Sequence, residues 1–153
     1  MFKKIIFISL IVISIGFPTR LFLLGSKSAE MHPTVGIQDG VLTPCPEKPN
    51  CVSSFAKETD EKHYLAYVAL TESPLQQIKE YAKKMNMTLE KESEGYLHFT
   101  EKTAIFKFVD DIEFLYIASE KKLHFRSASR VGHSDMSANR KRMNAFLEML
   151  RSK

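Results

Sequence analysis

The chain has 153 residues, of which 44% are hydrophobic and 26% are charged. This length suits one domain, and the composition excludes a disordered or low-complexity chain. The formal net charge is +4, but residues 1–29 contain four basic residues and no acidic one, so the remaining 18 basic and 18 acidic residues balance. Because non-specific nucleic-acid binding requires an excess of positive charge, we expect no nucleic-acid partner.

The N-terminus is typical of an export signal. Lys3 and Lys4 precede an apolar run over residues 5–17, which matches the charged and hydrophobic regions of a secretory signal peptide. A signal peptidase could cut after Ser28; without the cut, residues 5–24 approach the length of about 20 residues that spans a bilayer. Residues 1–29 are therefore predicted to be a signal peptide or an uncleaved inner-membrane anchor. The rest of the chain is expected in the cell envelope, in a periplasmic or other extracytoplasmic location.

The next segment joins this leader to the domain, which we place at residues 42–153. Residues 30–41 contain Pro, Gly and Asp without a periodic pattern and are predicted to be a linker, with a short edge strand at residues 41–42. Cys45 and Cys51 follow, six residues apart and bracketed by prolines. In an exported chain an even cysteine count favours a disulfide. A redox or metal role is less favoured, because there is no Cys-x-x-Cys motif and no further ligand nearby.

The remaining pattern predicts a two-layer α+β sandwich, in which two helices cover an antiparallel meander sheet. The aromatic and β-branched segment 63–70 is predicted as a strand. Residues 73–87 follow as an amphipathic helix, with its apolar stripe at Leu75, Ile78, Ala82 and Met85. Strands are predicted at 88–92, 95–101, 104–109, 112–119 and 121–129, and a closing helix at 135–153. These five segments are expected to supply the four strands between the two helices in the predicted order, which is β-α-β-β-β-β-α.

A hairpin between the last two strands decides where the charges lie. If residues 120–121 form its tip, Arg130 lies opposite Asp111, and Glu113 lies diagonally between Arg126 and Arg130. Two acidic residues and two arginines then share one face of the sheet. Internal pairing of this kind accounts for the acidic excess before residue 121 and the basic excess after it; the alternative is a one-sided basic patch.

The closing helix carries an apolar stripe, Met143, Phe146, Leu147 and Leu150, which Asn139 extends by one turn. A buried Asn must find hydrogen-bond partners or cost about 1–3 kcal/mol. Asp135 or Ser134 is expected as the helix N-cap. Arg140, Lys141 and Arg142 are expected to remain free surface charges.

Three segments resemble the DUF1499 family, a family of proteins of unknown function: "PCPEKPNCVSS", "FVDDIEF" and "RSASRVGHSDMSANRKR", in this order. The resemblance spans roughly residues 42–150, and one departure is Ser137, where similar sequences usually have Gly. The family's name assigns no activity. The resemblance implies a signature constellation, of which Cys51 belongs to the expected disulfide and the others form a candidate polar binding cluster: Asn50, Ser53, Ser54, Asp110, Asp111, Glu113, Arg126, Ser127, Ser129, Arg130, Asp135, Asn139 and Arg140.

Arginines beside hydroxyl and amide groups suit recognition of carboxylates and phosphates. The first hypothesis is therefore a non-enzymatic binding or structural module whose partner is an anionic small molecule, a lipid head group or an envelope protein. The leader adds the membrane as a partner if it is uncleaved. We assign no catalytic residue and expect no cofactor or metal.

Two other functions are weighed against this hypothesis. A hydrolase would use Ser53 or Ser54 as nucleophile and His133 as base, with Asp110 or Asp135 to orient the base, but no nucleophile-elbow motif supports it. A metal site at Asp110, Asp111 and Glu113 is disfavoured, because Asp110 points to the opposite face of a regular strand.

Overall fold

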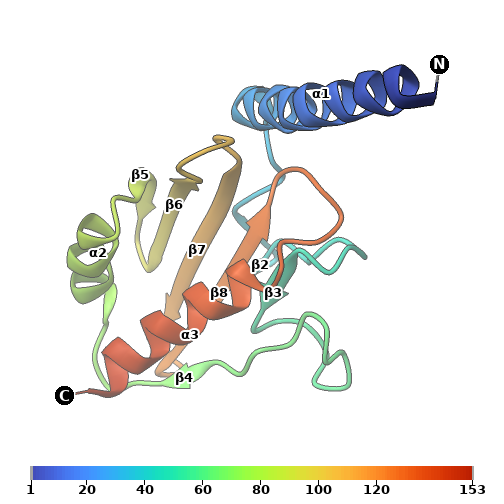
Figure 1. The fold of residues 1–153 in the computed structure, drawn as a ribbon. Helices are drawn as coiled ribbons and strands as arrows, with labels where there is room; N and C mark the ends of the chain where they lie inside the picture. Colours follow the sequence, from blue (N-terminus) through green and yellow to red (C-terminus); the bar gives the residue numbers. More distant parts are fainter. Residues whose placement is uncertain (1, 153) are drawn as a thin grey trace.

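The structure, a computed structural model, describes residues 2–152, with side chains described from residue 16 onward. Along the chain the elements are α1 (Phe2–Glu30), β1 (Ile37–Gln38), β2 (Val41–Leu42), β3 (Cys51–Ser53), β4 (Val68–Ala69), α2 (Leu75–Lys84), β5 (Thr88–Ser93), β6 (Tyr96–Lys102), β7 (Val109–Ile117), β8 (Lys122–Ser129) and α3 (Ala138–Arg151) (Figure 1).

Six strands form one antiparallel sheet in the order β3-β8-β7-β6-β5, with β4 pairing the other end of β8. The strands β5 to β8 are the predicted meander, and α2 and α3 pack on one face of the sheet (Figure 1). The small hairpin β1–β2 packs on the other face, where Leu42 meets Tyr96 and Leu115. The α+β fold class is confirmed.

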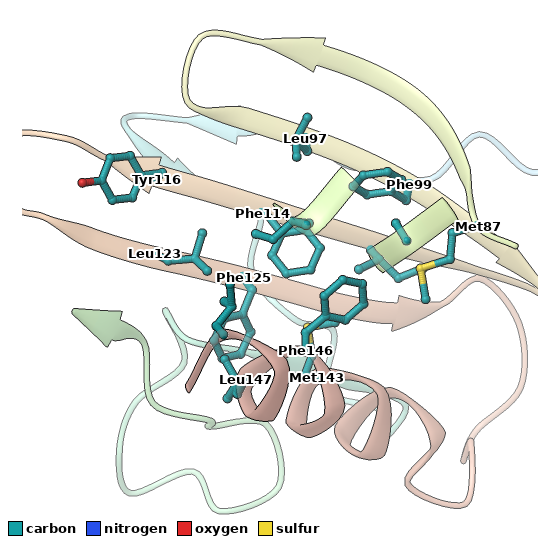
Figure 2. Packing of buried hydrophobic residues seen from close by; sticks show 14 of the residues in the cluster. Met87, Leu97, Phe99, Phe114, Tyr116, Leu123, Phe125, Met143, Phe146 and Leu147 are labelled. Atoms are coloured by element: carbon teal, nitrogen blue, oxygen red, sulfur yellow. The ribbon is translucent and has the colours of Figure 1, made fainter. Parts of the chain in front are cut away.

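The core forms because alternate residues of β7 and β8 face the helices. Phe114 of β7 and Phe125 of β8 are fully buried and lie against Met143 and Phe146 of α3 (Figure 2). The ring centroids of Phe114 and Phe146 are 4.9 Å apart. The predicted stripe of α3 is therefore buried as expected, together with Asn139.

The predicted stripe of α2 is right except at its end. Ile78 and Ala82 are buried, whereas Met85 is 40% exposed and Met87 is buried in its place. The helix ends at Lys84, and Asn86 takes a positive φ of 56°. This turn directs the chain back toward the core at Met87, two positions after the predicted Met85.

Two predicted strands are largely absent. Within residues 63–70, β4 and one bridge between Tyr64 and Ser53 are the only strand pairings. Val68 packs on the core from β4, and Leu65 and Leu70 pack on it from irregular chain. Residues 104–109 were predicted as a strand, but residues 103–108 form the β6–β7 loop, because Lys102 already pairs with Val109. The sequence pattern also missed β3 at the disulfide.

The hairpin register is corrected by two residues. Glu113 lies opposite Arg126, and Asp111 lies opposite Ala128. The cause is the turn, which contains four residues, 118–121, with Lys121 at φ 55°. Since side chains alternate with a period of two, a two-residue shift keeps every residue on its predicted face and changes only the partners.

The predicted leader falls partly outside the residues with described side chains, because those of residues 2–15 are not among them. In the part of the chain that the structure describes, no helix is both long and apolar enough to cross a membrane.

Candidate functional site

The predicted polar residues form two clusters on opposite faces of the sheet, not one. We call the first the outer cluster, on the face away from α2 and α3; it consists of Tyr96, His98, Asp111, Glu113, Arg126 and Arg130. We call the second the inner cluster, beneath the start of α3; it consists of Asn50, Glu101, Asp110, Ser127, Ser129, Asn139 and Arg142. Asp110 and Asp111 are separated in this way because consecutive strand residues point to opposite faces.

Glu113 is the centre of the outer cluster, and its side chain is fully buried. One carboxylate oxygen accepts hydrogen bonds from Tyr96 Oη at 2.9 Å and from the backbone N–H of Gly36 at 2.6 Å. The other accepts from Arg126 Nη1 at 2.9 Å. Burial, followed by the charge of Glu113, raises the pKa of the Tyr96 hydroxyl, so Tyr96 acts as a donor.

Asp111 forms the second ion pair of the outer cluster. Arg130 donates two parallel hydrogen bonds to its carboxylate, from Nε at 2.8 Å and from Nη2 at 2.9 Å. His98 Nε2 lies 2.9 Å from one of the carboxylate oxygens. Burial opposes ionisation, but the hydrogen bonds from Arg130 and His98 outweigh it and hold the pKa of Asp111 below its ordinary value. Bidentate pairing of this kind is strong and fixes the geometry of the guanidinium.

A cavity of about 460 Å³ adjoins the outer cluster. Asp111, Arg126 and Arg130 form its polar wall, while residues 31–34 and 43–46 form the opposite wall, which includes three prolines. Arg126 is only 6% exposed, and no group of the described residues accepts a hydrogen bond from its Nε–H. Arg126 is therefore paired on one side of its guanidinium only.

The inner cluster is a connected hydrogen-bond network, in which one buried acceptor, Asn50 Oδ1, has no partner among the described residues. Arg142 donates to Asp110 Oδ2 at 2.7 Å, to Glu101 and to Ser127 Oγ. Asn139 donates from its amide to Ser129 Oγ and to the backbone oxygen of Asn50, both at 3.0 Å. The prediction that Asn139 needs buried partners is confirmed, and the expectation of Arg142 as a free surface charge is wrong. This network fastens α3 to the sheet.

The two serines of the hydrolase alternative lie at the end of β3, which pairs with β8 along the edge opposite β7. Ser53 Oγ accepts from Phe55 N–H, and Ser54 Oγ accepts from Phe125 N–H at 3.0 Å. The histidine within hydrogen-bond distance of Ser54 is His124, at 3.1 Å, whose ring stacks on Phe55. His133 is exposed, and no hydrogen bond of the described residues joins it to either serine.

Asp135 and Arg140 serve structure rather than a cluster. Asp135 accepts hydrogen bonds from the backbone N–H groups of Ser137 and Asn139 and so stabilises the start of α3. The expected N-cap position was wrong, because that position is Ser137, whose side chain makes no capping hydrogen bond. Arg140 is half-buried and donates to the backbone oxygens of Glu61, Lys62 and Tyr64. It therefore holds the loop before β4, and its expected freedom is wrong.

Sequence reasoning missed Tyr96, His98, Glu101 and Arg142. Their signals were present: Tyr96 and His98 alternate on a strand next to β7, and Arg142 lies three residues after Asn139, on the same side of a helix. Without the strand register, none of these positions can be assigned a partner.

The disulfide between Cys45 and Cys51 is present and links the cavity wall to β3. The family described as protein of unknown function (DUF1499) matches residues 41–150. The chain belongs to this family. The DUF1499 match begins at β2 and ends in α3, so it contains every residue of the two clusters. No curated protein and no solved structure matches the chain.

Proposed function

We propose that this DUF1499 protein is a non-enzymatic binding module of the cell envelope. The cavity beside the outer cluster binds a ligand that has an anionic group, a carboxylate or a phosphate, attached to a short apolar chain. The observation that carries the proposal is Arg126, a buried guanidinium beside a cavity with an N–H that no protein group of the described residues accepts.

The state of Arg126 separates binding from a purely structural role. Arg130 is satisfied, because its guanidinium donates to both oxygens of Asp111 and to the backbone oxygens of Ser28 and Met31. Arg126 instead makes one ion pair, with Glu113, and keeps Nε–H without a protein acceptor in the described residues. Leaving a buried charged donor unpaired costs more than leaving a neutral one, so an acceptor that reaches this N–H from the cavity would supply the missing hydrogen bond.

The cavity walls indicate the chemistry of the rest of the ligand. The two arginines face two carboxylates, so the ion pairs cancel in charge, and recognition depends on directed hydrogen bonds to the anion. The opposite wall, from Met31, Pro33, Pro44 and Pro46, is largely apolar and suits a short alkyl chain.

The envelope location is part of the proposal and rests on the leader. Its two lysines and apolar run direct export, and the Cys45–Cys51 disulfide is typical of an oxidising compartment. The membrane is a partner in this proposal through residues 5–24.

The test is thermal unfolding of the full chain in lipid nanodiscs with butyl phosphate, butyrate, inorganic phosphate or butanol. We expect butyl phosphate or butyrate to raise the midpoint saturably, inorganic phosphate to act weakly, and butanol to have no effect. Arg126→Lys keeps the positive charge but removes Nε–H and should abolish the shift, whereas Arg151→Lys, at the exposed end of α3, should keep it.

If no anion shifts the midpoint, or if the shift survives Arg126→Lys, the proposal is wrong. The Nε–H resonance of Arg126 in the wild type gives a second measurement, independent of how stable the variant is. Its chemical shift should move during titration with butyl phosphate. No movement at saturating concentrations would contradict the proposal.

A further inference from the structure

The end of α1 is packed into the folded domain. The Val109 N–H donates to Ser28 Oγ at 2.9 Å, and Ser28 is fully buried. Arg130 Nη1 donates to the backbone oxygens of Ser28 and Met31. The helix therefore continues into the domain without a free segment at Ser28, the position where the sequence suggested cleavage.

Gly25 brings α1 into contact with the β6–β7 loop. A Cβ at residue 25 would lie 1.6 Å from the backbone oxygen of Phe106, so only glycine permits this approach. Figure 1 shows the same arrangement, with the C-terminal end of α1 directly beside the loop between β6 and β7. Residue 25 immediately follows the predicted span, residues 5–24, and a helix rises about 1.5 Å per residue. The loop consequently lies at the level where the apolar span ends.

The composition of the β6–β7 loop suits a position at the membrane surface, where the predicted apolar span ends. Its residues 103–108 read TAIFKF, and the Ile105 side chain is 73% exposed. On α1, Phe22 and Leu23 are also exposed, at 56% and 65%. Three exposed lysines, Lys27, Lys102 and Lys107, flank these apolar side chains. Apolar side chains rimmed by basic ones are the pattern of surfaces that enter the head-group region of anionic membranes.

We infer that the β6–β7 loop and the last turns of α1 form one membrane-contacting surface, which inserts Ile105 into the bilayer that holds the leader. The surface orients the domain, so that residues 31–34, which form one wall of the cavity, lie next to the head groups. The inference rests on the proposed membrane anchoring of residues 5–24 and does not require a ligand in the cavity.

The test uses the full chain in vesicles of phosphatidylcholine and phosphatidylglycerol, with an environment-sensitive fluorophore on Ile105→Cys. The two native cysteines form a disulfide, so the new thiol is labelled selectively. Ser119→Cys is the control: it is exposed in the β7–β8 turn, at the other end of a nine-residue strand, about 30 Å away. Doxyl groups on the lipid acyl chains should quench the label at residue 105 severalfold more than the label at residue 119.

Two further arms separate the causes. Gly25→Leu should reduce quenching at residue 105, because a side chain there displaces the loop from α1, and vesicles without phosphatidylglycerol should reduce it through the lysines. Equal quenching at residues 105 and 119 in vesicles that the protein floats with would contradict this inference alone. Failure of the protein to float with the vesicles would contradict the membrane anchoring and this inference together, and would leave the proposed anion site standing.

Discussion

At the scale of single residues, the outer cluster shows how buried charge is tolerated. Glu113 and Asp111 are almost inaccessible, and taking two such ion pairs out of water is costly. Each carboxylate is therefore supplied with three donors: Glu113 by Tyr96, Gly36 and Arg126, and Asp111 by both bonds of Arg130 and by His98. Removing any one donor leaves a buried charge short of a partner.

The depressed pKa of Asp111 predicts a loss of stability in acid. The folded-state pKa lies below the unfolded-state value of about 3.9, so the unfolded chain takes up the proton first. The stabilisation is complete above that value and is lost as pH falls through the folded-state pKa. We expect the free energy of unfolding, measured in urea, to fall steeply below about pH 4.

Asp111→Asn should lower stability at neutral pH and flatten this acid slope. Ala128→Gly, which changes the uncharged residue opposite Asp111, should lower stability without altering the slope. An unchanged slope in Asp111→Asn would show that Asp111 does not contribute to the acid dependence.

At the scale of elements, β7 and β8 show what a sequence pattern can predict. Alternation assigned Ile112, Phe114 and Phe125 to the core face and the charged residues to the other face, since that assignment depends only on the strand period. The directly opposed residues were wrong by two positions, because they depend on the turn, and the left-handed Lys121 that lengthens the turn has no sequence signature as clear as Asn-Gly. The predicted pairing of Arg130 with Asp111 nevertheless forms, between diagonal neighbours.

The candidate site, like the sheet, could be predicted from the sequence only in part. The residue types and the two arginine–carboxylate pairs follow from facing strands, whereas Arg142, Tyr96 and His98 depend on the packing of α3 on β7 and on the register of β6 against β7. The segment 104–109 was predicted as a strand because its aromatic and apolar residues resemble a buried edge strand; in the loop Ile105 is exposed, and Phe106 and Phe108 are half-buried.

The start of α3 is strained at Ser137, which has a φ of 65°. Only glycine adopts this conformation without steric cost, which gives a physical reason for the Gly that the family resemblance implies at this position. We expect Ser137→Gly to raise the free energy of unfolding by roughly 0.5–1 kcal/mol, net of the greater entropy of glycine in the unfolded chain, measured by urea unfolding. Lys141→Gly, at an exposed position within the same helix, should instead lower it by roughly 0.5–1 kcal/mol. A destabilised Ser137→Gly would mean that the left-handed conformation costs nothing here.

At the scale of the whole molecule, the sheet carries different layers on its two faces. Helices α2 and α3 bury one face with apolar side chains, as Figure 2 shows for α3. Short segments bury the other: the end of α1, the β1–β2 hairpin and the chain around Cys45. These segments contribute few apolar side chains, Leu42 being the main one, and are held by polar contacts such as Gly36 to Glu113 and Arg130 to Met31. The cavity lies in this second layer.

The disulfide should therefore matter more for the second layer than for the core. Cys51 is in β3 and Cys45 is in the cavity wall, so the bond ties that wall to the sheet. For a short loop we expect reduction to lower the free energy of unfolding by about 2 kcal/mol, measured by urea unfolding with and without reductant. Cys45→Ser with Cys51→Ser should match the reduced protein and no longer respond to reductant.

Because the cavity wall is no longer tied to β3 in this double variant, the shift of the unfolding midpoint by butyl phosphate should weaken, even at temperatures where the core stays folded. A full ligand shift in that variant would mean that residues 43–46 are held in place without the bond.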